Sequence, residues 1–435
     1  METNTKTREK KSIPQISEKR RKIGNLSLFA GIFALTTAYF HFYSWYSFLA
    51  PYGTLTAALF LIVTFFCYVD IRYALKDPAF YLMAFADLLA LVNLFAIGSH
   101  KGAILTIADF LLILYLANKV RLSDLEILVS SLYIGAFFIY WTIDVKGYFK
   151  GYNTNYGGLV LISGFVFLIF AVEYLYHRTV NRVSSSGEQK QIDSGGYISA
   201  GAALMDVPGK VEERKRTYVI ITRILELILF YIAFRIIAWY RSRCALIGLI
   251  VFLVLFLIPR SVWKNKLLYG LLVFFSTVGS ILFSIFYVFL GMFREQVEFR
   301  LFYKDLISGR EEVWAELWTE YIKRPFTGIG SSYVMKLEWM EGLFEVHSGL
   351  LDILIVHGLV VFIITCMFLI FRLLAIREVC AAGTPAKAAA AGIYAMLFTA
   401  FLENYIIVAP FSLMLLLLFS YVNSLEIQCG DDPSL

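Results

Sequence analysis

Long apolar runs recur along almost the whole chain, and they constrain the fold more than any other feature of the sequence. Twelve runs can be marked, and most approach the ~20 residues that a helix needs to cross a bilayer. Inside a bilayer every backbone polar group needs a partner, so only helices and closed barrels span it. A barrel would show alternating segments of about ten residues, which is not the pattern here. The runs therefore predict an all-α polytopic membrane protein with about 12 transmembrane helices.

Each run has an approximate range. In chain order the runs are Leu26–Phe48, Gly53–Val69, Ala79–Gly98, Ala103–Asn118, Leu125–Ile143, Gly157–Tyr176, Tyr218–Ala238, Ala245–Ile258, Leu267–Met292, Gly349–Phe371, Ala388–Leu402 and Ile406–Val422. The eighth run is the shortest, and Arg243 and Arg260 flank it, where long basic side chains can snorkel to the membrane surface.

Composition excludes several classes of protein. Apolar residues make up 59% of the chain and charged residues 17%, against roughly 45–50% and about 25% in a soluble domain. This balance excludes a soluble enzyme and a disordered chain, and a net charge of +6 gives no footprint for nucleic acid. The five cysteines show neither a pairing nor a metal-binding pattern, which excludes a secreted disulfide scaffold. A polar N-terminal stretch precedes the first run, and no cleavage site follows that run, so we expect it to stay as an anchor.

Lysine and arginine residues set the predicted orientation. With the N-terminus in the cytoplasm, 25 of the 39 basic residues lie inside and 12 lie outside, as the positive-inside rule requires. An even number of spans returns the C-terminus to the cytoplasm. The predicted segments are a basic tail (1–25), spans one to nine (26–292) with a flexible cytoplasmic connector (177–217), an outer loop (293–348), spans ten to twelve (349–422) and a second tail (423–435).

The outer loop carries the exception to the charge rule. It has 56 residues, seven of them basic, and basic residues kept outside require an anionic partner there. Within the loop, Arg310–Lys323 carries one apolar stripe at helical spacing that includes Trp314 and Trp318. This stripe predicts an amphipathic helix lying at the membrane interface. Arg324-Pro325 ends that helix, and Gly328-Ile-Gly330 predicts a flexible turn.

One of the five histidines stands apart by its surroundings. His41, His100, His177 and His357 are interpreted as packed or solvated side chains, and for His357, inside the tenth run, a structural hydrogen bond is expected. His347 lies just before the tenth run, at a helix N-terminus on the outer surface, with polar neighbours and nearby arginines.

These segments resemble the hallmark sequences of the bacterial O-antigen ligase and O-antigen polymerase superfamily. The matching segments are Ser308-Gly309-Arg310 with Trp314, Arg324-Pro325 with Gly328 and Gly330, His347-Ser348 with Leu351 and Gly358, Tyr240-Arg241-Ser242-Arg243, and Asn153-Thr154-Asn155 with Gly157. Each segment is loose alone, but five in the family's order are specific, and they cover about residues 151–371. Thr154 replaces the family's proline, Ser348 its asparagine and Val361 its second glycine.

The resemblance implies the substrates. Members of the superfamily transfer a glycan from undecaprenyl pyrophosphate to an acceptor sugar on the outer face of the bacterial inner membrane. A polymerase uses another lipid-linked repeat as the acceptor, and a ligase uses lipid A core. The implied partners are the lipid-linked donor, one of these acceptors, the bilayer, and other polysaccharide export and assembly proteins. No cofactor is implied.

The chemistry of the matched residues fits a pyrophosphate leaving group. Arginine is always charged and grips phosphate through two donors, so Arg243 and Arg310 are the candidates for stabilising the charge that develops. The sequence has no Asp-x-Asp pair of the kind that holds a metal for the same purpose, which favours arginine over a metal. The imidazole of His347 is the candidate base for the acceptor hydroxyl, with inversion at the anomeric carbon as the expected outcome.

Further substrate-binding candidates are Asn153, Asn155, Arg241, Arg324 and Asp352. Asp352 lies one turn after His347 and either orients it or is a solvated carboxylate. The two asparagines either bind the sugar and pyrophosphate or cap the sixth span, and Arg324 faces either the substrate or lipid headgroups.

Two alternatives stay open at this point. Ser348, together with the lack of a core-recognition feature, favours a polymerase slightly over a ligase. A transporter is the alternative from another class, but the chain shows no repeat symmetry of the transporter kind. The charged residues within its spans form no relay.

Overall fold

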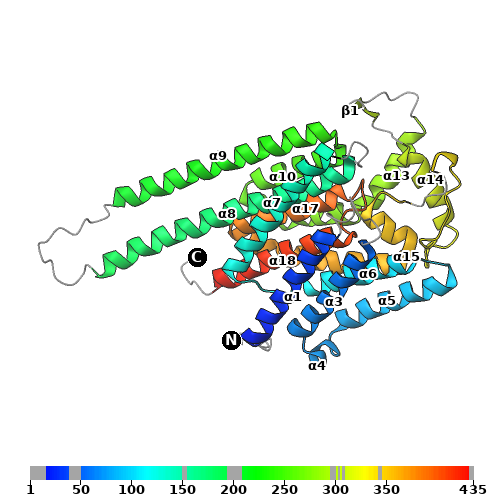
Figure 1. Ribbon diagram of the computed structural model, residues 1–435, viewed down its shortest axis with the longest axis horizontal. Helices are drawn as coiled ribbons and strands as arrows, with labels where there is room; N and C mark the ends of the chain where they lie inside the picture. Colours follow the sequence, from blue (N-terminus) through cyan, green and yellow to red (C-terminus); the bar gives the residue numbers. More distant parts are fainter. Residues whose placement is uncertain are drawn as a thin grey trace, which may run out of the picture.

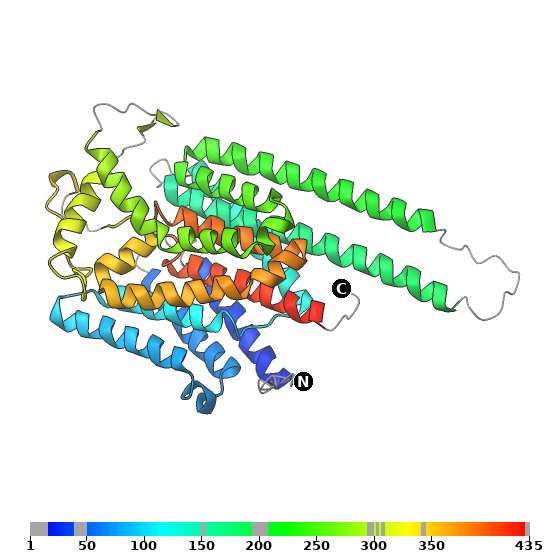
Figure 2. The ribbon, with the colours of Figure 1, turned by 180° about the vertical axis from the view of Figure 1, so that it is seen from behind.

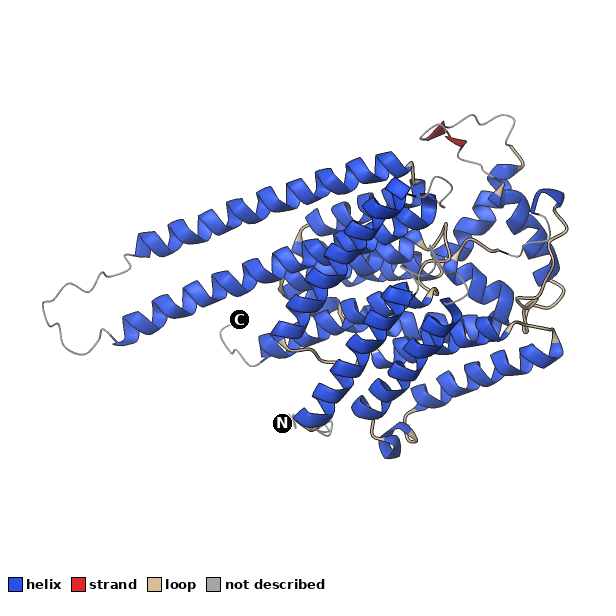
Figure 3. Cartoon of the chain, in the orientation of Figure 1, coloured by secondary structure: helices blue, strands red, loops and turns tan. Residues whose placement is uncertain are grey.

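The computed structural model describes residues 16–38, 50–148, 154–193, 208–293, 300–301, 304–305, 309–340 and 345–430. Helices make up nearly all of this part of the chain, and Figures 1 and 3 show most of them side by side in one elongated bundle. In the first half of the chain the helices are α1 (Glu18–Thr36), α3 (Ala50–Tyr68), α4 (Ile71–Ala74), α5 (Pro78–Ala96), α6 (Lys101–Leu116), α7 (Asp124–Tyr148) and α8 (Thr154–Asp193).

The second half continues the bundle and adds a short strand pair. Its helices are α9 (Pro208–Tyr240), α10 (Arg243–Leu257), α11 (Arg260–Lys264), α12 (Lys266–Thr277), α13 (Gly279–Gly291), α14 (Arg310–Tyr321), the 3₁₀ turn η4 (Glu338–Met340), α15 (Gly349–Ala375), α16 (Arg377–Ala382), α17 (Thr384–Thr399) and α18 (Ala409–Gly430). Strands β1 (Arg300–Leu301) and β2 (Lys304–Asp305) pair antiparallel between α13 and α14.

The helical prediction is confirmed for the described residues, while the number of spans stays a prediction. Every apolar run falls on a helix, although the ninth is divided between α12 and α13 and the end of the first lies outside the described residues. Among the described residues, five helices are long and apolar enough to cross a membrane, and a sixth span results if α12 and α13, which are bent by 58°, count as one. The length and composition of these helices are those of a membrane protein.

The segment predicted as a flexible connector, 177–217, is helical at both of its ends, and its middle part, 194–207, lies outside the described residues. Helix α8 continues to Asp193 and α9 begins at Pro208, and Figures 1 and 2 show the two as an antiparallel pair that extends beyond the bundle. An ion-pair cluster joins α8 to α9. In it, Arg223 Nη1 lies 2.8 Å from Glu173 Oε1 and 2.5 Å from Glu226 Oε2.

Helix α15 is interrupted at Gly358, and a loop fills the break. Gly358 has φ 86°, and the amides of Ile329 and Gly330 donate to the carbonyls of Ile355 and Val356 at 2.8 and 3.2 Å. These bonds satisfy carbonyls that the break would otherwise leave open. A Cβ at Gly358 would lie 2.2 Å from the Phe326 carbonyl oxygen, so only glycine fits there.

The glycines at 328 and 330 do not form the predicted flexible turn. Both have positive φ, and a Cβ at Gly328 would lie 2.5 Å from the Val356 carbonyl oxygen. The amide of Leu359 also donates to the Pro325 carbonyl at 2.8 Å. The segment 325–330 is therefore fixed against the break in α15 by backbone contacts, which require glycine at the points of closest approach.

Helix α17 occupies the centre of the bundle and sets the position of the turn that follows it. Its alanines at 388–391 are fully buried, and α17 packs against α8, α10 and α18. The approach is close, because a Cβ at Gly392 would lie 2.2 Å from a Val166 side-chain carbon and one at Gly248 would lie 2.5 Å from Thr399 Oγ1. The chain between α17 and α18 is thereby held at a defined point of the bundle.

Candidate active site

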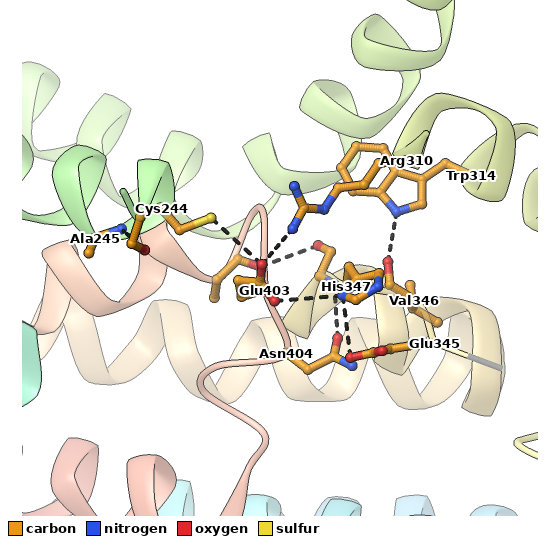
Figure 4. A network of polar contacts seen from close by, with 12 residues as sticks. Cys244, Ala245, Arg310, Trp314, Glu345, Val346, His347, Glu403 and Asn404 are labelled. Carbon is orange, nitrogen blue, oxygen red and sulfur yellow. Dashed lines mark hydrogen bonds and ion pairs between the residues drawn. The ribbon is translucent and has the colours of Figure 1, made fainter. Parts of the chain in front are cut away.

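The centre of the candidate site is the turn between α17 and α18. Its Glu403 has a side chain that is only 8% exposed, and the carboxylate faces two residues that the sequence singled out. Oxygen Oε1 accepts a hydrogen bond from Arg310 Nη2 at 2.5 Å, and Oε2 lies 3.6 Å from His347 Nδ1 (Figure 4). Arg310 and His347 are 37 positions apart in the sequence, and Glu403 brings them together.

His347 is held in an uncommon backbone conformation by the same turn. It has φ 54°, and the next amide, that of Ser348, donates to Asn404 Oδ1 at 2.9 Å. The amide of Gly349 donates to the carbonyls of Ala400 and Glu403 at 2.8 and 3.1 Å. Positive φ is costly for a non-glycine residue and persists where neighbours over-determine it, as is common at functional sites.

A second carboxylate faces the same ring nitrogen of His347. Glu345 Oε1 lies 3.3 Å from His347 Nδ1, while the His347 side chain is one-quarter exposed. The carboxylates in ion-pair range of this imidazole are therefore Glu345 and Glu403. Asp352, the residue that the sequence offered as an orienting group, has no contact with His347 in the described structure and lines a neighbouring cavity instead.

Arg310 begins α14 and is nearly buried. The N-cap Gly309 has φ 89°, which lets the chain turn sharply into the helix, and the Arg310 side chain is 11% exposed. Burial lowers the pKa of the Arg310 guanidinium, but Glu403 and other neighbouring groups raise it by more, so the net shift is upward and the charge is retained. Its buried Nε has no hydrogen-bond partner within the described residues, which leaves one donor of the guanidinium unpaired.

Helix α14 forms as predicted, but its apolar stripe faces the protein rather than a membrane surface. Val313, Trp314 and Leu317 are buried, and α14 packs against α13 and α15. Trp314 Nε1 donates to the Val346 carbonyl at 2.7 Å, directly beside His347. The stripe is thus the packing surface that places Arg310 and His347 on the same side of Glu403.

Arg243 begins α10 next to this cluster. Ser242 caps the helix, and the adjacent Cys244 Sγ lies 3.7 Å from Glu403 Oε1. Arg243, Arg310 and Glu403 all lie within electrostatic range of that thiol. The structure therefore places Arg310 against Glu403, and Arg243 directly before the cysteine that contacts the same carboxylate.

The other predicted residues lie further away or outside the described residues. Asn155 is half-buried in the first turn of α8, close to where Gly157 packs against the Tyr240 ring, and Asn153 lies outside the described residues. Arg241 is exposed with φ 54°. Arg324 is exposed after α14, with no side-chain contact to the cluster in the part of the chain that the structure describes.

Sequence reasoning missed Glu403 and Asn404. Both lie in the short gap between the eleventh and twelfth runs, which the charge pattern places on the same face as His347. A polar pair in so short a gap was the signal that would have found them. Without the fold, nothing in the sequence connected that gap to the loop before the tenth run.

These features define a helical membrane protein with an arginine–glutamate–histidine cluster where α14 meets the bundle. Residues 228–366 match the sequence profile of a family described as O-antigen ligase, which places this part of the chain in the O-antigen ligase and polymerase superfamily and confirms the resemblance. The match includes Arg243, Arg310, His347 and Gly358, whereas Glu403 lies beyond it. No curated protein and no solved structure matches the chain.

Proposed function

We propose that the protein transfers a glycan from undecaprenyl pyrophosphate to an acceptor sugar at the outer face of the bacterial inner membrane, as a polysaccharide polymerase. The observation that carries this proposal is the joining of Arg310 and His347 by Glu403. A reaction that expels a pyrophosphate and deprotonates a sugar hydroxyl needs a fixed cation and a base within one site, and this cluster supplies both.

The arginines supply the charge for the leaving group. Arg310 donates a hydrogen bond from Nη2 to Glu403, and its Nε is unpaired. One carboxylate therefore orients the guanidinium, which still has donors for phosphate oxygens. Arg243 adds a second positive charge at the start of α10, where the helix N-terminus also favours an anion. This arrangement supports a reaction in which arginine, rather than a metal, stabilises the departing pyrophosphate.

His347 supplies the base. The carboxylates of Glu345 and Glu403 both face Nδ1, which favours the tautomer with its proton on Nδ1 and leaves the lone pair on Nε2. Nε2 then takes the proton from the acceptor hydroxyl as its oxygen attacks the anomeric carbon, and the two carboxylates stabilise the imidazolium that forms. Attack opposite the leaving pyrophosphate inverts the anomeric centre.

The choice of polymerase over ligase follows from the residue after the base. Ser348 stands where ligases of the superfamily usually have asparagine, and Ser348 Oγ donates to the Ala400 carbonyl at 3.3 Å, so its side chain is directed to the scaffold. The ligase alternative differs only in the acceptor, which would be lipid A core, and it is an outcome of the experiment below.

The experiment supplies the purified protein with one lipid-linked repeat unit and no other acceptor. We expect a ladder of longer lipid-linked glycans on a gel, and His347→Ala should lower the rate by roughly 10²–10⁴-fold, the usual contribution of a general base. His177→Ala is the matched control, because His177 lies on α8 away from the cluster. Turnover only after lipid A core is added identifies a ligase, and full activity of His347→Ala contradicts the assignment of the base.

A further inference from the structure

A cavity of about 340 Å³ lies beside the α17–α18 turn, and Asn404 of that turn lines it. It is partly open and is lined by α3, α6, α15, the loop at Ser331 and the turn that carries Asn404. Sites for small molecules typically measure about 300–1,000 Å³, so this cavity accommodates a small sugar unit. Neither Arg243 nor Arg310 is among its described lining residues.

Two side chains of α15 reach this cavity and have unused hydrogen-bonding capacity. Asp352 lines it and has no side-chain hydrogen bond in the described structure. His357 is 4% exposed, and its buried Nδ1 has no partner among the described residues, so the structural hydrogen bond expected for it is not formed. Leaving a buried polar atom unpaired costs about 1–3 kcal/mol, and such atoms in native proteins commonly await a ligand or water.

The chemistry of the lining suits a neutral saccharide and not a pyrophosphate. Thr106 and Ser331 supply hydroxyl groups, Asn404 an amide, His357 an imidazole and Asp352 a carboxylate. The described lining contains neither lysine nor arginine. A pyrophosphate would lie against Asp352 with no cation to balance it. Sugar hydroxyls both donate and accept, and they pair with each of these groups.

Asn404 connects the cavity to the base. Its side chain lines the cavity, and its Oδ1 accepts from the Ser348 amide, the residue next to His347. Figure 4 shows Asn404 on the side of His347 away from Arg310. A saccharide in the cavity would therefore approach His347 from the side opposite the cation that holds the leaving group, as an inverting displacement requires.

We propose that this cavity is the subsite for the acceptor saccharide, with Asp352 and His357 bonding its hydroxyls and Asn404 guiding it to His347. The inference rests on the function proposed above and adds to it the place where the acceptor binds. It assigns the donor pyrophosphate and the acceptor sugar to opposite sides of the α17–α18 turn.

The test uses the repeat-unit oligosaccharide released from its lipid by mild acid, which lacks the pyrophosphate and so acts only as an acceptor. Its binding to the full-length protein in nanodiscs is measured by calorimetry. Asp352→Asn should weaken binding by about tenfold or more, the loss expected when hydrogen bonds to a charged group are removed. The cavity-filling Ala103→Trp should weaken binding by a similar factor, because its side chain occupies the space of the sugar. Arg310→Ala should leave this affinity unchanged.

Leu105→Trp is the matched control for the cavity-filling variant. Leu105 is on the same helix, α6, but is 39% exposed and does not line the cavity, so the same tryptophan side chain is introduced on the same helix outside the cavity. Undecaprenyl pyrophosphate is the second probe: Arg310→Ala should weaken its binding, and Ala103→Trp should not. Asp352→Asn keeps the volume of the side chain, so a loss of binding in this variant is not caused by a change in packing.

The outcomes separate the inference from the function. Wild-type oligosaccharide affinity in Ala103→Trp and Asp352→Asn overturns the inference, even if the protein polymerises glycan. Weakened undecaprenyl pyrophosphate binding in Ala103→Trp also overturns it, because the cavity then belongs to the donor. Oligosaccharide binding that is lost in these variants, in a protein with no transfer activity, overturns the proposed function and supports the saccharide site.

Discussion

Two clusters in this protein join an arginine to buried carboxylates, and they differ in what each leaves unpaired. In the Arg310 cluster the unpaired groups within the described residues are nitrogens, Nε of Arg310 and Nδ1 of His347. In the Arg223 cluster the open groups are acceptors, one oxygen each on Glu173 and Glu226. A surplus of donors attracts an anion and a surplus of carboxylate oxygens repels it, so an arginine–glutamate pair alone does not define a phosphate site.

The clusters also differ in how the chain builds them. The Arg310 cluster collects α14, the segment before α15 and the α17–α18 turn, which are distant in sequence. The Arg223 cluster links α8 and α9, two antiparallel helices that follow one another in the chain. The first arrangement converges on a point in space, as an active site does, and the second holds two helices together.

Removing one carboxylate from each cluster is the sharpest test of this difference. We expect Glu403→Ala to lower kcat by roughly 10²–10³-fold, because His347 and Arg310 both lose their orienting partner. Glu173→Ala should lower the melting temperature and leave the kcat of the folded protein unchanged. A pH profile of kcat that shifts in Glu403→Gln separates an effect on the base from simple loss of structure. Equal kcat losses in both alanine variants would remove the distinction between the clusters.

Exchanging arginine for lysine tests the geometry of the donors. Arg310→Lys should lower kcat by about 10–10²-fold, because an ammonium ion cannot hold Glu403 and phosphate oxygens in one planar fork. Arg223→Lys should have little effect on kcat. Single-turnover rates with the lipid-linked repeat measure both, and an unaffected Arg310→Lys enzyme would show that only charge is needed.

The scaffold beneath the Arg310 cluster is a broken helix, and its glycine can be tested directly. Gly358→Ala combines a positive φ with a Cβ that would lie 2.2 Å from a carbonyl oxygen, so we expect a loss of about 1–3 kcal/mol or more in stability. Gly270→Ala, where nothing lies within 4 Å of the added Cβ, is the control. Thermal unfolding in detergent compares them, and equal melting temperatures would contradict the packing at the break.

The smallest effect is expected at the surface of the segment 309–340. Hydrogen bonds from Lys336 and Lys323 lower the pKa of Glu320 to about 2. A depressed pKa contributes stability that is present above the pKa of the unfolded chain, about 4.3, and is lost as pH falls toward 2. Glu320→Gln should therefore lower the melting temperature slightly and equally between pH 5 and 8, and less in high salt. A difference from wild type that changes between pH 5 and 8 would exclude this pairing.

Hydropathy predicted the helices, because apolar length is local information, and periodicity predicted α14. The stripe of α14 showed which face was apolar but not what covers it, so Trp314 was assigned to a membrane surface when it packs beside Val346. Arg243, Arg310 and His347 were found by motif. Glu403 was not, because its role arises from tertiary contacts of a turn that is short in sequence and central in space.

The segment 325–330, which bonds to the break in α15 at Gly358, is synthesised before the helix that it contacts. Segment 325–330 leaves the ribosome before α15, yet its amides are the partners of the Ile355 and Val356 carbonyls. Within a bilayer open carbonyls are expensive, so α15 reaches its final depth only once this earlier segment has folded back onto it. The helix that begins directly after His347 and Ser348 therefore depends, for the satisfaction of its own backbone, on a segment that precedes it in the chain.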